Sequence, residues 1–270
     1  MTKKTLQGRT AVLTGATGGI GSAVARELAR AGVRLVLVGR NDSKLEALLG
    51  ELAGARHVAV SADLATARGR TKLADLASSG FIDVDILVNC LGTSDFRLIE
   101  DQDDDSIESL LKTNLLGPVL VCRDLLPALR RQKNALIVNV GSTFGSIGYP
   151  GFSTYCASKF GLRGFTEALR RELADSNVSV CYFAPRATRT ALNAGNVDAM
   201  NAALGTAVDD PAAVATAILK LINGRRQARR FLGWPEKLFV RINAVLPGLV
   251  DRALRRQLPT IRRFAQTTIK

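Results

Sequence analysis

The sequence is poor in histidine and in paired cysteines, and both shortages exclude classes of site. Its 270 residues contain one histidine, His57, so a histidine-rich metal site is excluded and a Ser-His-Asp hydrolase would depend on that single residue. The four cysteines, Cys90, Cys122, Cys156 and Cys181, are far apart and form no C-x-x-C pair. The spacing argues against a zinc ribbon and a thioredoxin-like site, and we expect no metal in the site.

Long apolar runs and targeting signals are also missing. No run approaches the roughly 20 apolar residues that a membrane-spanning helix needs. Met1–Arg9 contains Lys3 and Lys4 but leads directly into a strand-like segment, without the apolar region and cleavage site of a signal peptide. Because sparse cysteines are typical of reduced thiols, we expect a cytoplasmic protein.

The chain has a large apolar fraction and an excess of positive charge. Apolar residues make up 47% of it, with 24 Gly and only 8 Pro, which suits one large α/β domain with a buried core. The formal net charge of +13 indicates an anionic partner, such as nucleic acid, an anionic membrane, an acidic carrier protein or an anionic cofactor. A basic surface without any such partner is an equal alternative.

Short apolar runs alternate with segments of helical periodicity. The predicted strands are Thr10–Ala16, Arg34–Gly39, His57–Ala62, Asp85–Cys90, Ala135–Val140, Val178–Phe183 and Arg229–Gly233. The predicted helices are Gly21–Ala31, Ser43–Leu52, Ala65–Ala77, Ser106–Arg131 with an interruption near Gly117 and Pro118, Phe152–Ala174 and Pro211–Ile222. Continuously apolar strands are buried on both faces, so the pattern predicts a Rossmann-type, doubly wound parallel α/β sheet of about seven strands. We assign 1–233 to this domain and 234–270 to an amphipathic helical extension.

A glycine-rich turn follows the first predicted strand. The residues that we expect to bind a dinucleotide there are Gly15, Thr17, Gly18, Gly19, Ile20 and Gly21. Glycines let the backbone approach a pyrophosphate closely, and the start of the next helix offers free N–H groups to the anion. The spacing G-x-x-x-G-x-G differs from the commoner G-x-G-x-x-G, so its place at the first β–α turn carries the interpretation. The alternative is that these glycines form a tight turn that binds no nucleotide.

The residue after the second strand distinguishes NAD from NADP. An acidic side chain there accepts hydrogen bonds from a free ribose 2′-OH, whereas a guanidinium pairs with a 2′-phosphate. Arg40, followed by Asn41, occupies the position, which predicts NADP(H); Asp42 comes later, at the expected start of a helix. Asp63 and Leu64, after the third strand, are placed to contact the adenine, although Asp63 could equally cap the next helix.

Ser142, Tyr155 and Lys159 form the candidate catalytic set. Tyr155 and Lys159 are four residues apart and share one face of the predicted helix. Ser142 follows the fifth strand, at the carboxyl edge of the sheet where doubly wound folds bind ligands. Asn114 lies in the long predicted helix after the fourth strand.

Taken in order, these motifs resemble the classical short-chain dehydrogenases/reductases over about residues 7–233. The matching elements are the turn Thr14–Gly21, Asn89-Cys90-Leu91-Gly92, Asn114, Ser142, Tyr155 with Lys159, and Pro185 to Thr190. The resemblance implies cofactor contacts from Asn89, Gly92, Tyr155, Lys159, Pro185, Thr188 and Thr190. The family has Asn-Ala where this chain has Cys90-Leu91, and glycine where it has Arg186.

The candidate set fits the chemistry of ketone reduction. A ketone that accepts a hydride develops alkoxide character and must be protonated. Tyr155 is the expected general acid, with its pKa lowered from about 10 by Lys159 and the cationic nicotinamide of the oxidised cofactor. Ser142 would hold the substrate oxygen, and Lys159 would also bond the nicotinamide ribose. The resemblance implies that Asn114 holds a water in a proton relay to Lys159.

Two further segments bear on the substrate and on partners. Thr188–Ala207 has apolar residues at helical spacing. We expect it either to close over a hydrophobic ketone or to pack as a helix on the domain. Residues 234–270 contain eight cationic and two acidic residues and an apolar stripe that Pro247-Gly248 should split. This extension could pack on its own domain or on a second subunit, lie on an anionic membrane, or meet an acyl carrier protein. Nucleic acid is a poor fit because no aromatic-interleaved basic surface occurs.

These observations predict an NADPH-dependent reductase of a 3-oxoacyl or similar hydrophobic, lipid-like ketone. The alternatives are an NAD(P)-dependent alcohol dehydrogenase working in the oxidative direction and a non-catalytic nucleotide-sensing protein. The family resemblance implies a homodimer or homotetramer formed through the long helices after the fourth and fifth strands. The expected location is the cytoplasm, with peripheral contact at the inner membrane surface as an alternative.

Overall fold

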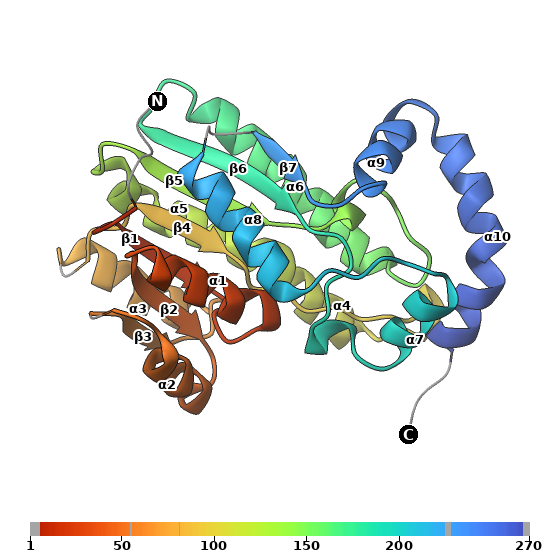
Figure 1. The fold of residues 1–270 in the computed structure, drawn as a ribbon, viewed down its shortest axis with the longest axis horizontal. Helices are drawn as coiled ribbons and strands as arrows, with labels where there is room; N and C mark the ends of the chain where they lie inside the picture. The colour runs from red at the N-terminus through yellow and green to blue at the C-terminus, as the bar shows by residue number, and fades with distance from the viewer. Residues whose placement is uncertain (1–5, 55, 81, 225–227, 267–270) are drawn as a thin grey trace.

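A parallel seven-stranded sheet forms the centre of the molecule (Figure 1). The computed structural model describes residues 6–54, 56–80, 82–224 and 228–266. The strands are β1 (Thr10–Thr14), β2 (Arg34–Gly39), β3 (Val58–Ser61), β4 (Ile86–Asn89), β5 (Ala135–Val140), β6 (Val178–Ala184) and β7 (Arg229–Phe231). Their order is β3-β2-β1-β4-β5-β6-β7, and every pairing is parallel. The predicted Rossmann-type, doubly wound fold is confirmed.

Apolar side chains on both faces of the strands explain this arrangement. Successive residues of a strand point to opposite faces of a sheet, and all five residues of β1 are buried. Leu13 belongs to the core beneath α1 (Gly19–Arg30), α2 (Asp42–Glu51) and α8 (Pro211–Asn223). Val12 belongs to the core beneath α3 (Ala67–Ser78), α5 (Gly117–Arg130) and α6 (Ser153–Glu172). Only a sheet with helices on both faces buries both sets.

The strand order creates a switch point between β1 and β4. The chain leaves β1 on the β2 side and later returns to β4 on the other side of β1. The register places Thr14, Asn89, Asn139 and Tyr182 side by side on four neighbouring strands. The turns that follow these strands therefore meet at one carboxyl edge, which is where doubly wound sheets bind their ligands.

The helix predicted over 106–131 is interrupted earlier than its sequence suggests. It consists of α4 (Asp104–Leu111), a π-helical turn η2 (Lys112–Leu116) and α5. In a continuous α-helix the carbonyl of Asn114 would accept from the N–H of residue 118, but Pro118 has no N–H. The N–H of Gly117 instead reaches the carbonyl of Lys112, five residues earlier. The interruption expected near Gly117 and Pro118 thus falls in the turn that carries Asn114.

Several other predicted bounds shift by one or two residues. β1 ends at Thr14 instead of Ala16, and α1 begins at Gly19 instead of Gly21. β2 and β5 agree with the prediction residue for residue. Short 3-10 turns follow at η1 (Ile99–Asp101), η3 (Thr143–Gly145) and η4 (Ala191–Asn193).

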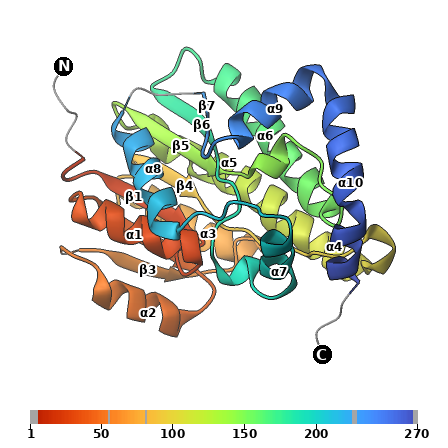
Figure 2. The same ribbon diagram turned by 45° about the vertical axis from the view of Figure 1, so that its right-hand side comes forward.

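The extension after β7 folds into two helices that form a bent arm beyond the end of the sheet (Figures 1 and 2). α9 (Glu236–Val245) and α10 (Pro247–Ala265) meet at Leu246, so the split expected at Pro247-Gly248 is present. α10 reaches α7 (Asn196–Ala203), where Ile261 is fully buried in a cluster with Phe152 and Met200. This end of the arm therefore packs on its own chain. Within the ranges that the structure describes, no helix has both the length and the hydropathy to cross a membrane.

Candidate active site

The turn between β1 and α1 leaves the start of a helix open to an anion. Gly15 has φ of 65°, and a Cβ there would lie 2.7 Å from the Cα of Leu91 in the loop after β4. Gly18 is the N-cap of α1, and no side chain caps this helix start. A Cβ on Gly19 would lie 2.6 Å from Cγ2 of Thr190, so this glycine allows the loop after β6 to approach the start of the helix, and both residues line the cavity. Free N–H groups with room above them fit the pyrophosphate of a dinucleotide.

Ser142 is held at the carboxyl end of β5 by a tyrosine from β6. The Tyr182 hydroxyl donates to the Ser142 carbonyl oxygen at 3.0 Å and accepts from the Ser142 backbone N–H at 3.1 Å. The Ser142 hydroxyl accepts from the N–H of Phe144 at 3.1 Å, which leaves its own proton to be donated. Sequence reasoning missed Tyr182, because a tyrosine in a buried strand carries no signal of a polar task.

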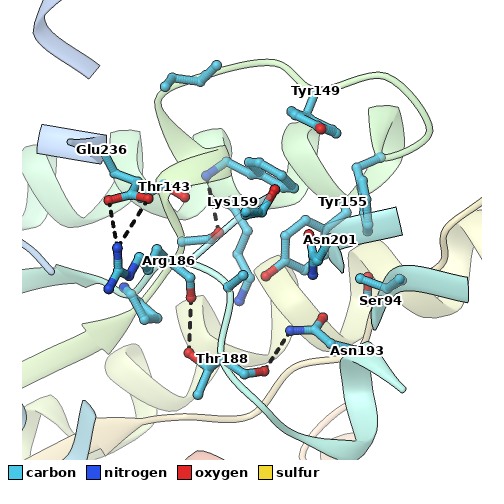
Figure 3. A pocket seen from close by; sticks show the side chains of 18 of the residues that line it. Ser94, Thr143, Tyr149, Tyr155, Lys159, Arg186, Thr188, Asn193, Asn201 and Glu236 are labelled. Atoms are coloured by element: carbon cyan, nitrogen blue, oxygen red, sulfur yellow. Dashed lines mark hydrogen bonds and ion pairs between the residues drawn. The ribbon is translucent and has the colours of Figure 1, made fainter. Parts of the chain in front are cut away.

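Tyr155 and Lys159 project from α6 into one cavity (Figure 3). Nζ of Lys159 lies 5.6 Å from the centroid of the Tyr155 ring, as expected for side chains one helical turn apart. The same Nζ approaches the carbonyl oxygen of Val140 at 3.5 Å. Ser142 lines this cavity too, and its side chain hydrogen bonds Tyr155. The structure thus brings the three predicted residues together.

Burial shifts the pKa values of this pair in opposite directions. It raises the pKa of Tyr155 to about 12, while the hydrogen bond with Ser142 acts to lower it. It lowers the pKa of Lys159 to about 8, since the charged ammonium is disfavoured away from water. The expectation that Lys159 lowers the pKa of Tyr155 is not met in the protein alone, because desolvation dominates. Tyr155 is accordingly a protonated acid at neutral pH.

Asn114 is fully buried and does not line the cavity. Its Oδ1 accepts from the N–H of Thr93 and its Nδ2 donates to the Thr93 carbonyl, both at 2.8 Å. Nδ2 also donates to the hydroxyl of Ser158, which in turn donates to the Tyr155 carbonyl. A Cβ placed on Gly92 would lie 3.5 Å from both Asn114 Oδ1 and Lys159 Nζ. Asn114 therefore fixes the loop after β4 beside the catalytic lysine.

The residues predicted to hold the adenosine end lie at the carboxyl edge but outside this cavity. Arg40 is exposed after β2 and forms no ion pair with any residue that the structure describes. The side chain of Asn41 caps α2 by accepting from the N–H of Lys44 at 2.8 Å. Asp63 accepts from the N–H of Ala65 at 3.0 Å, while α3 is capped by Thr66.

Asn89 and Leu64 make contacts within the fold itself. The Asn89 amide donates to Oδ1 of Asn139 at 2.9 Å and to Sγ of Cys122 at 3.3 Å, which joins β4 to β5 and α5. Leu64 is buried in the core beneath α3 and α5. Thr17 lies close to Gly39, at the end of β2. These residues are placed near an adenosine site, but Asn41, Asp63 and Asn89 already use their side chains within the protein.

Arg186 gives the loop after β6 an unusual set of partners (Figure 3). Its guanidinium pairs with Asp209 at 2.7 Å and with Glu236 at 3.3 Å, and the neighbouring Thr188 hydroxyl donates to the Arg186 carbonyl at 3.0 Å. Asp209 precedes α8, and Glu236 begins α9. The departure from the family's glycine therefore ties the nicotinamide-side loop to the base of the arm.

The cavity has a volume of about 730 Å³. The predicted residues that line it are Gly18, Gly19, Ile20, Gly21, Gly92, Ser142, Tyr155, Lys159, Pro185, Thr188 and Thr190. Those that do not line it are Gly15, Thr17, Arg40, Asn41, Asp63, Leu64, Asn89 and Asn114. The catalytic and nicotinamide-side candidates thus share one space.

Most of the rest of the cavity wall is apolar. Three stacked or tilted aromatic rings, Phe144, Tyr149 and Phe152, form one part of its wall. α7 and the turn before it contribute Leu192, Val197 and Met200, and the arm contributes Phe239, Ile242, Leu249, Val250, Ala253 and Leu254. Sequence reasoning found the apolar stripe of the arm but could not direct it to the active site, because only the fold brings residues 239–254 opposite Tyr155.

Comparison with known proteins agrees with this geometry. The family model described as short chain dehydrogenase matches residues 9–201. The chain is 39% identical over 171 residues to 3-oxoacyl-(acyl-carrier-protein) reductase of Bos taurus, covering 63% of this chain and 72% of that protein. It is 33% identical over 193 residues to NADP-dependent 3-hydroxy acid dehydrogenase of Schizosaccharomyces pombe, covering 68% and 73%.

Solved structures give the same result. The crystal structure of 3-ketoacyl-(acyl-carrier-protein) reductase from Brucella melitensis complexed with NADH superposes with a TM-score of 0.77 and 26% identity, covering 86% of this chain and 99% of that one. The family match includes β1, the glycine turn, Ser142, Tyr155 and Lys159. The chain therefore belongs to the classical short-chain dehydrogenase/reductase family, whose members are oxidoreductases that bind NAD(P)(H).

Proposed function

We propose that the protein reduces a 3-oxoacyl or similarly hydrophobic ketone to a secondary alcohol, with NADPH as the hydride donor. The observation that carries the proposal is the composition of the cavity: Ser142, Tyr155 and Lys159 face a space whose remaining wall is mainly apolar. When bound, the cofactor supplies a hydride to the carbonyl carbon. The protein must then bind the ketone, hold its oxygen and deliver one proton to it.

The proton comes from Tyr155. Its raised pKa keeps the phenol protonated at neutral pH, so it can donate to an oxygen that becomes an alkoxide. The Ser142 hydroxyl, which accepts from Phe144 and in the protein alone hydrogen bonds Tyr155, would turn its proton to the same substrate oxygen. Lys159, with a pKa of about 8 and its Nζ 5.6 Å from the centroid of the Tyr155 ring, would supply the proton that restores Tyr155. The Asn114 carbonyl, which lacks its α-helical partner because of Pro118, is the group that would hold a relay water beside Lys159.

The residues of the β1–α1 turn would hold the pyrophosphate, because α1 starts without a side-chain cap. We assign Gly15, Thr17, Gly18, Gly19, Ile20 and Gly21 to this contact. Pro185, Thr188 and Thr190 would contact the nicotinamide end together with Tyr155, Lys159 and Gly92. Asp63, Leu64, Asn41 and Asn89 are assigned to the adenosine end through their positions at the sheet edge.

Arg40 is proposed to select NADPH over NADH. The exposed guanidinium stands where a 2′-phosphate would lie in a doubly wound fold. We expect Arg40→Asp to weaken NADPH binding at least tenfold, a loss of about 1.4 kcal/mol, and to leave NADH binding unchanged or stronger. Isothermal titration calorimetry with each nucleotide measures this. An unchanged preference in the variant would refute the role of Arg40 in cofactor selection. A wild type that binds NADH as tightly as NADPH would refute the assignment of NADPH and favour NADH, which the Brucella melitensis reductase binds in its crystal structure.

The substrate class follows from the apolar wall and from relatives that are named as reductases of 3-oxoacyl groups. The test is NADPH consumption with matched short-chain and long-chain 3-oxoacyl thioesters. A clear preference for the long chain is expected, because its tail would contact Met200, Leu249 and Leu254. Absence of turnover with both, despite NADPH binding, would refute the substrate class and leave the two alternatives: oxidation of an alcohol, and nucleotide sensing without catalysis.

We further propose that two copies assemble through α4, α5 and α6 in the cytoplasm, with residues 234–270 as an extension of the same domain. Leu116 before α5 and Phe160 in α6 are 46% and 42% exposed, and an interface formed by these helices would bury both. Substitution of both by Glu should convert the assembly to monomers in size-exclusion chromatography with light scattering. An acyl carrier protein that contacts the basic residues of 234–270 is a proposed partner, and it would present the 3-oxoacyl group as a thioester.

A further inference from the structure

The arm formed by α9 and α10 exposes apolar side chains that serve neither the core nor the cavity. Trp234, Leu238, Val245 and Leu246 are 69%, 40%, 77% and 55% exposed, and none of them lines the cavity. Leu238 and Val245 are seven residues apart and therefore share one face of α9, and Leu246 forms the bend between the helices. We call these four side chains the elbow patch. Soluble proteins rarely leave such apolar side chains together in water without a partner.

Positive charge surrounds the elbow patch. Lys237 and Arg241 are exposed on α9, and Arg241 lies on the same face as Leu238 and Val245. On α10, exposed Arg252, Arg255 and Arg256 alternate with Val250 and Leu254, which face the cavity.

Acidic residues do not balance this charge. Glu236 is paired with Arg186, and Asp251 is the other acidic residue of the arm. The outer side of the arm is therefore apolar at its bend and cationic along both helices.

The combination selects one kind of partner. A second copy of the chain would bring two equally cationic arms together, and nucleic acid would leave the apolar side chains in water. An acidic protein would pair with the arginines but has no special use for exposed Trp234 before α9 and the three aliphatic side chains on α9 and at its bend. An anionic bilayer satisfies both features, because its phosphates attract the Lys and Arg side chains and its acyl boundary accepts the apolar ones.

We propose that the elbow patch inserts into an anionic lipid surface, with the arginines of α10 and Arg241 on the headgroups. No described helix is able to span the bilayer, so the contact is peripheral. Phe239 and Leu249 are half exposed and also line the cavity, so they lie between the elbow patch and the substrate space. The cavity would therefore open at the membrane, where a hydrophobic acyl substrate resides. This last consequence rests on the proposed function, whereas membrane binding does not.

Trp234 is the only tryptophan of the chain, so its fluorescence reports on the elbow patch alone. The full-length protein, without cofactor or substrate, is titrated with vesicles of phosphatidylglycerol and phosphatidylcholine, and with phosphatidylcholine alone. A blue shift on the anionic vesicles, with quenching by brominated acyl chains, is expected, as is weak binding to the neutral vesicles. Unshifted emission and no co-sedimentation with anionic vesicles would overturn the proposal.

Matched variants separate the apolar contribution to vesicle binding from the electrostatic one. Val245→Ser combined with Leu246→Ser removes apolar contact at exposed positions and should weaken vesicle binding at least tenfold; Ile99→Ser, also at an exposed site, is the control. Arg252→Gln with Arg256→Gln should weaken it similarly, against a control that removes the same charge at exposed Arg68 and Lys133.

Two results would redirect the assignment. Binding that depends on the arginines but not on Val245 and Leu246 would overturn insertion and favour an acidic protein. If instead the serine variant dissociates an oligomer while the wild type ignores vesicles, the elbow patch is a subunit contact. Because no turnover is measured, these outcomes are independent of the proposed reaction.

Discussion

At the scale of single residues, Tyr182 shows how a side chain without reaction chemistry can govern the site. Its hydroxyl holds both backbone groups of Ser142 and also approaches the Lys159 carbonyl at 3.4 Å. It thereby links β6 to the serine after β5 and to the helix that carries Tyr155. The position of the Ser142 hydroxyl depends on these backbone bonds, since the residue lies in a loop.

Tyr182→Phe should test this positioning role. The ring is retained, so packing in β6 is preserved, but the Ser142 N–H and C=O lose their partner, at about 1–3 kcal/mol of stability. We expect kcat to fall roughly tenfold, with a smaller change in the dissociation constant of NADPH. Steady-state kinetics and urea unfolding measure the two effects. A variant that loses stability but keeps the wild-type kcat would show that Tyr182 only packs.

Lys159 makes the stability of the cofactor-free protein depend on pH in a defined direction. Its pKa is lowered from 10.5 to about 8 by burial. Between these values the unfolded chain binds a proton that the folded chain has released, so the free energy of unfolding rises with pH through this window. Below the folded pKa both states are protonated, and the cost of burying the charge is fully present.

Lys159→Met removes this dependence. The difference in unfolding free energy between wild type and variant should shift in favour of the wild type by about 2–3 kcal/mol between pH 7.5 and 10.5. Urea denaturation at several pH values measures this difference. Tyr182 and Tyr155 are present in both proteins, so their contributions to the pH dependence cancel in the difference. A difference that stays constant across this range would mean that the pKa of Lys159 is the same in the folded and unfolded protein.

At the scale of elements, the strands and the glycine turn were predictable, because buried parallel strands are continuous apolar runs. Arg34–Gly39 and Ala135–Val140 agree without a shift. The π-helical turn at Lys112–Leu116 was not, since Pro118 marks an interruption but does not say which residues absorb it. Ser142, Tyr155 and Lys159 were predictable as a set from spacing and family resemblance.

The sequence could not predict which residues far apart along the chain contact one another. Arg186 pairs with residues 23 and 50 positions later, and no local pattern marks either of them. The apolar stripe of the arm fits a membrane, a second subunit or the chain itself, and only the contact of α10 with α7 shows where Ile261 goes. Asn41 and Asn89 were identified by position, whereas their hydrogen bonds depend on the three-dimensional fold.

Ile261→Ala tests whether α10 is an integral wall of the cavity. Ile261 is fully buried in the cluster with Phe152, Val197 and Met200, so the truncation should cost about 2–5 kcal/mol of stability. A loosened wall should also raise KM for a long-chain 3-oxoacyl thioester more than for a short one. Thermal unfolding and kinetics with both thioesters measure this. Val245→Ala, at 77% exposure on the same arm, is the control and should be close to neutral. Equal KM changes for both chain lengths would contradict the wall.

At the scale of the whole molecule, the cavity lies where three parts of the fold meet. The sheet edge supplies the glycine turn, Ser142 and the loop after β6; α6 supplies Tyr155 and Lys159; α7 and the arm supply the apolar side (Figures 1 and 3). The family match ends at residue 201, so the arm lies outside it. A shared catalytic core and a separate apolar wall explain how one family fold could act on a hydrophobic ketone.

The most direct test of this account compares two tyrosines that line the same cavity. Tyr155→Phe and Tyr149→Phe each remove one hydroxyl and keep the ring. Turnover of a long-chain 3-oxoacyl thioester with NADPH should fall by a factor of about 10² to 10⁴ in Tyr155→Phe, with NADPH binding intact, while Tyr149→Phe stays near the wild type. Full turnover in Tyr155→Phe would contradict the central claim that this phenol protonates the product.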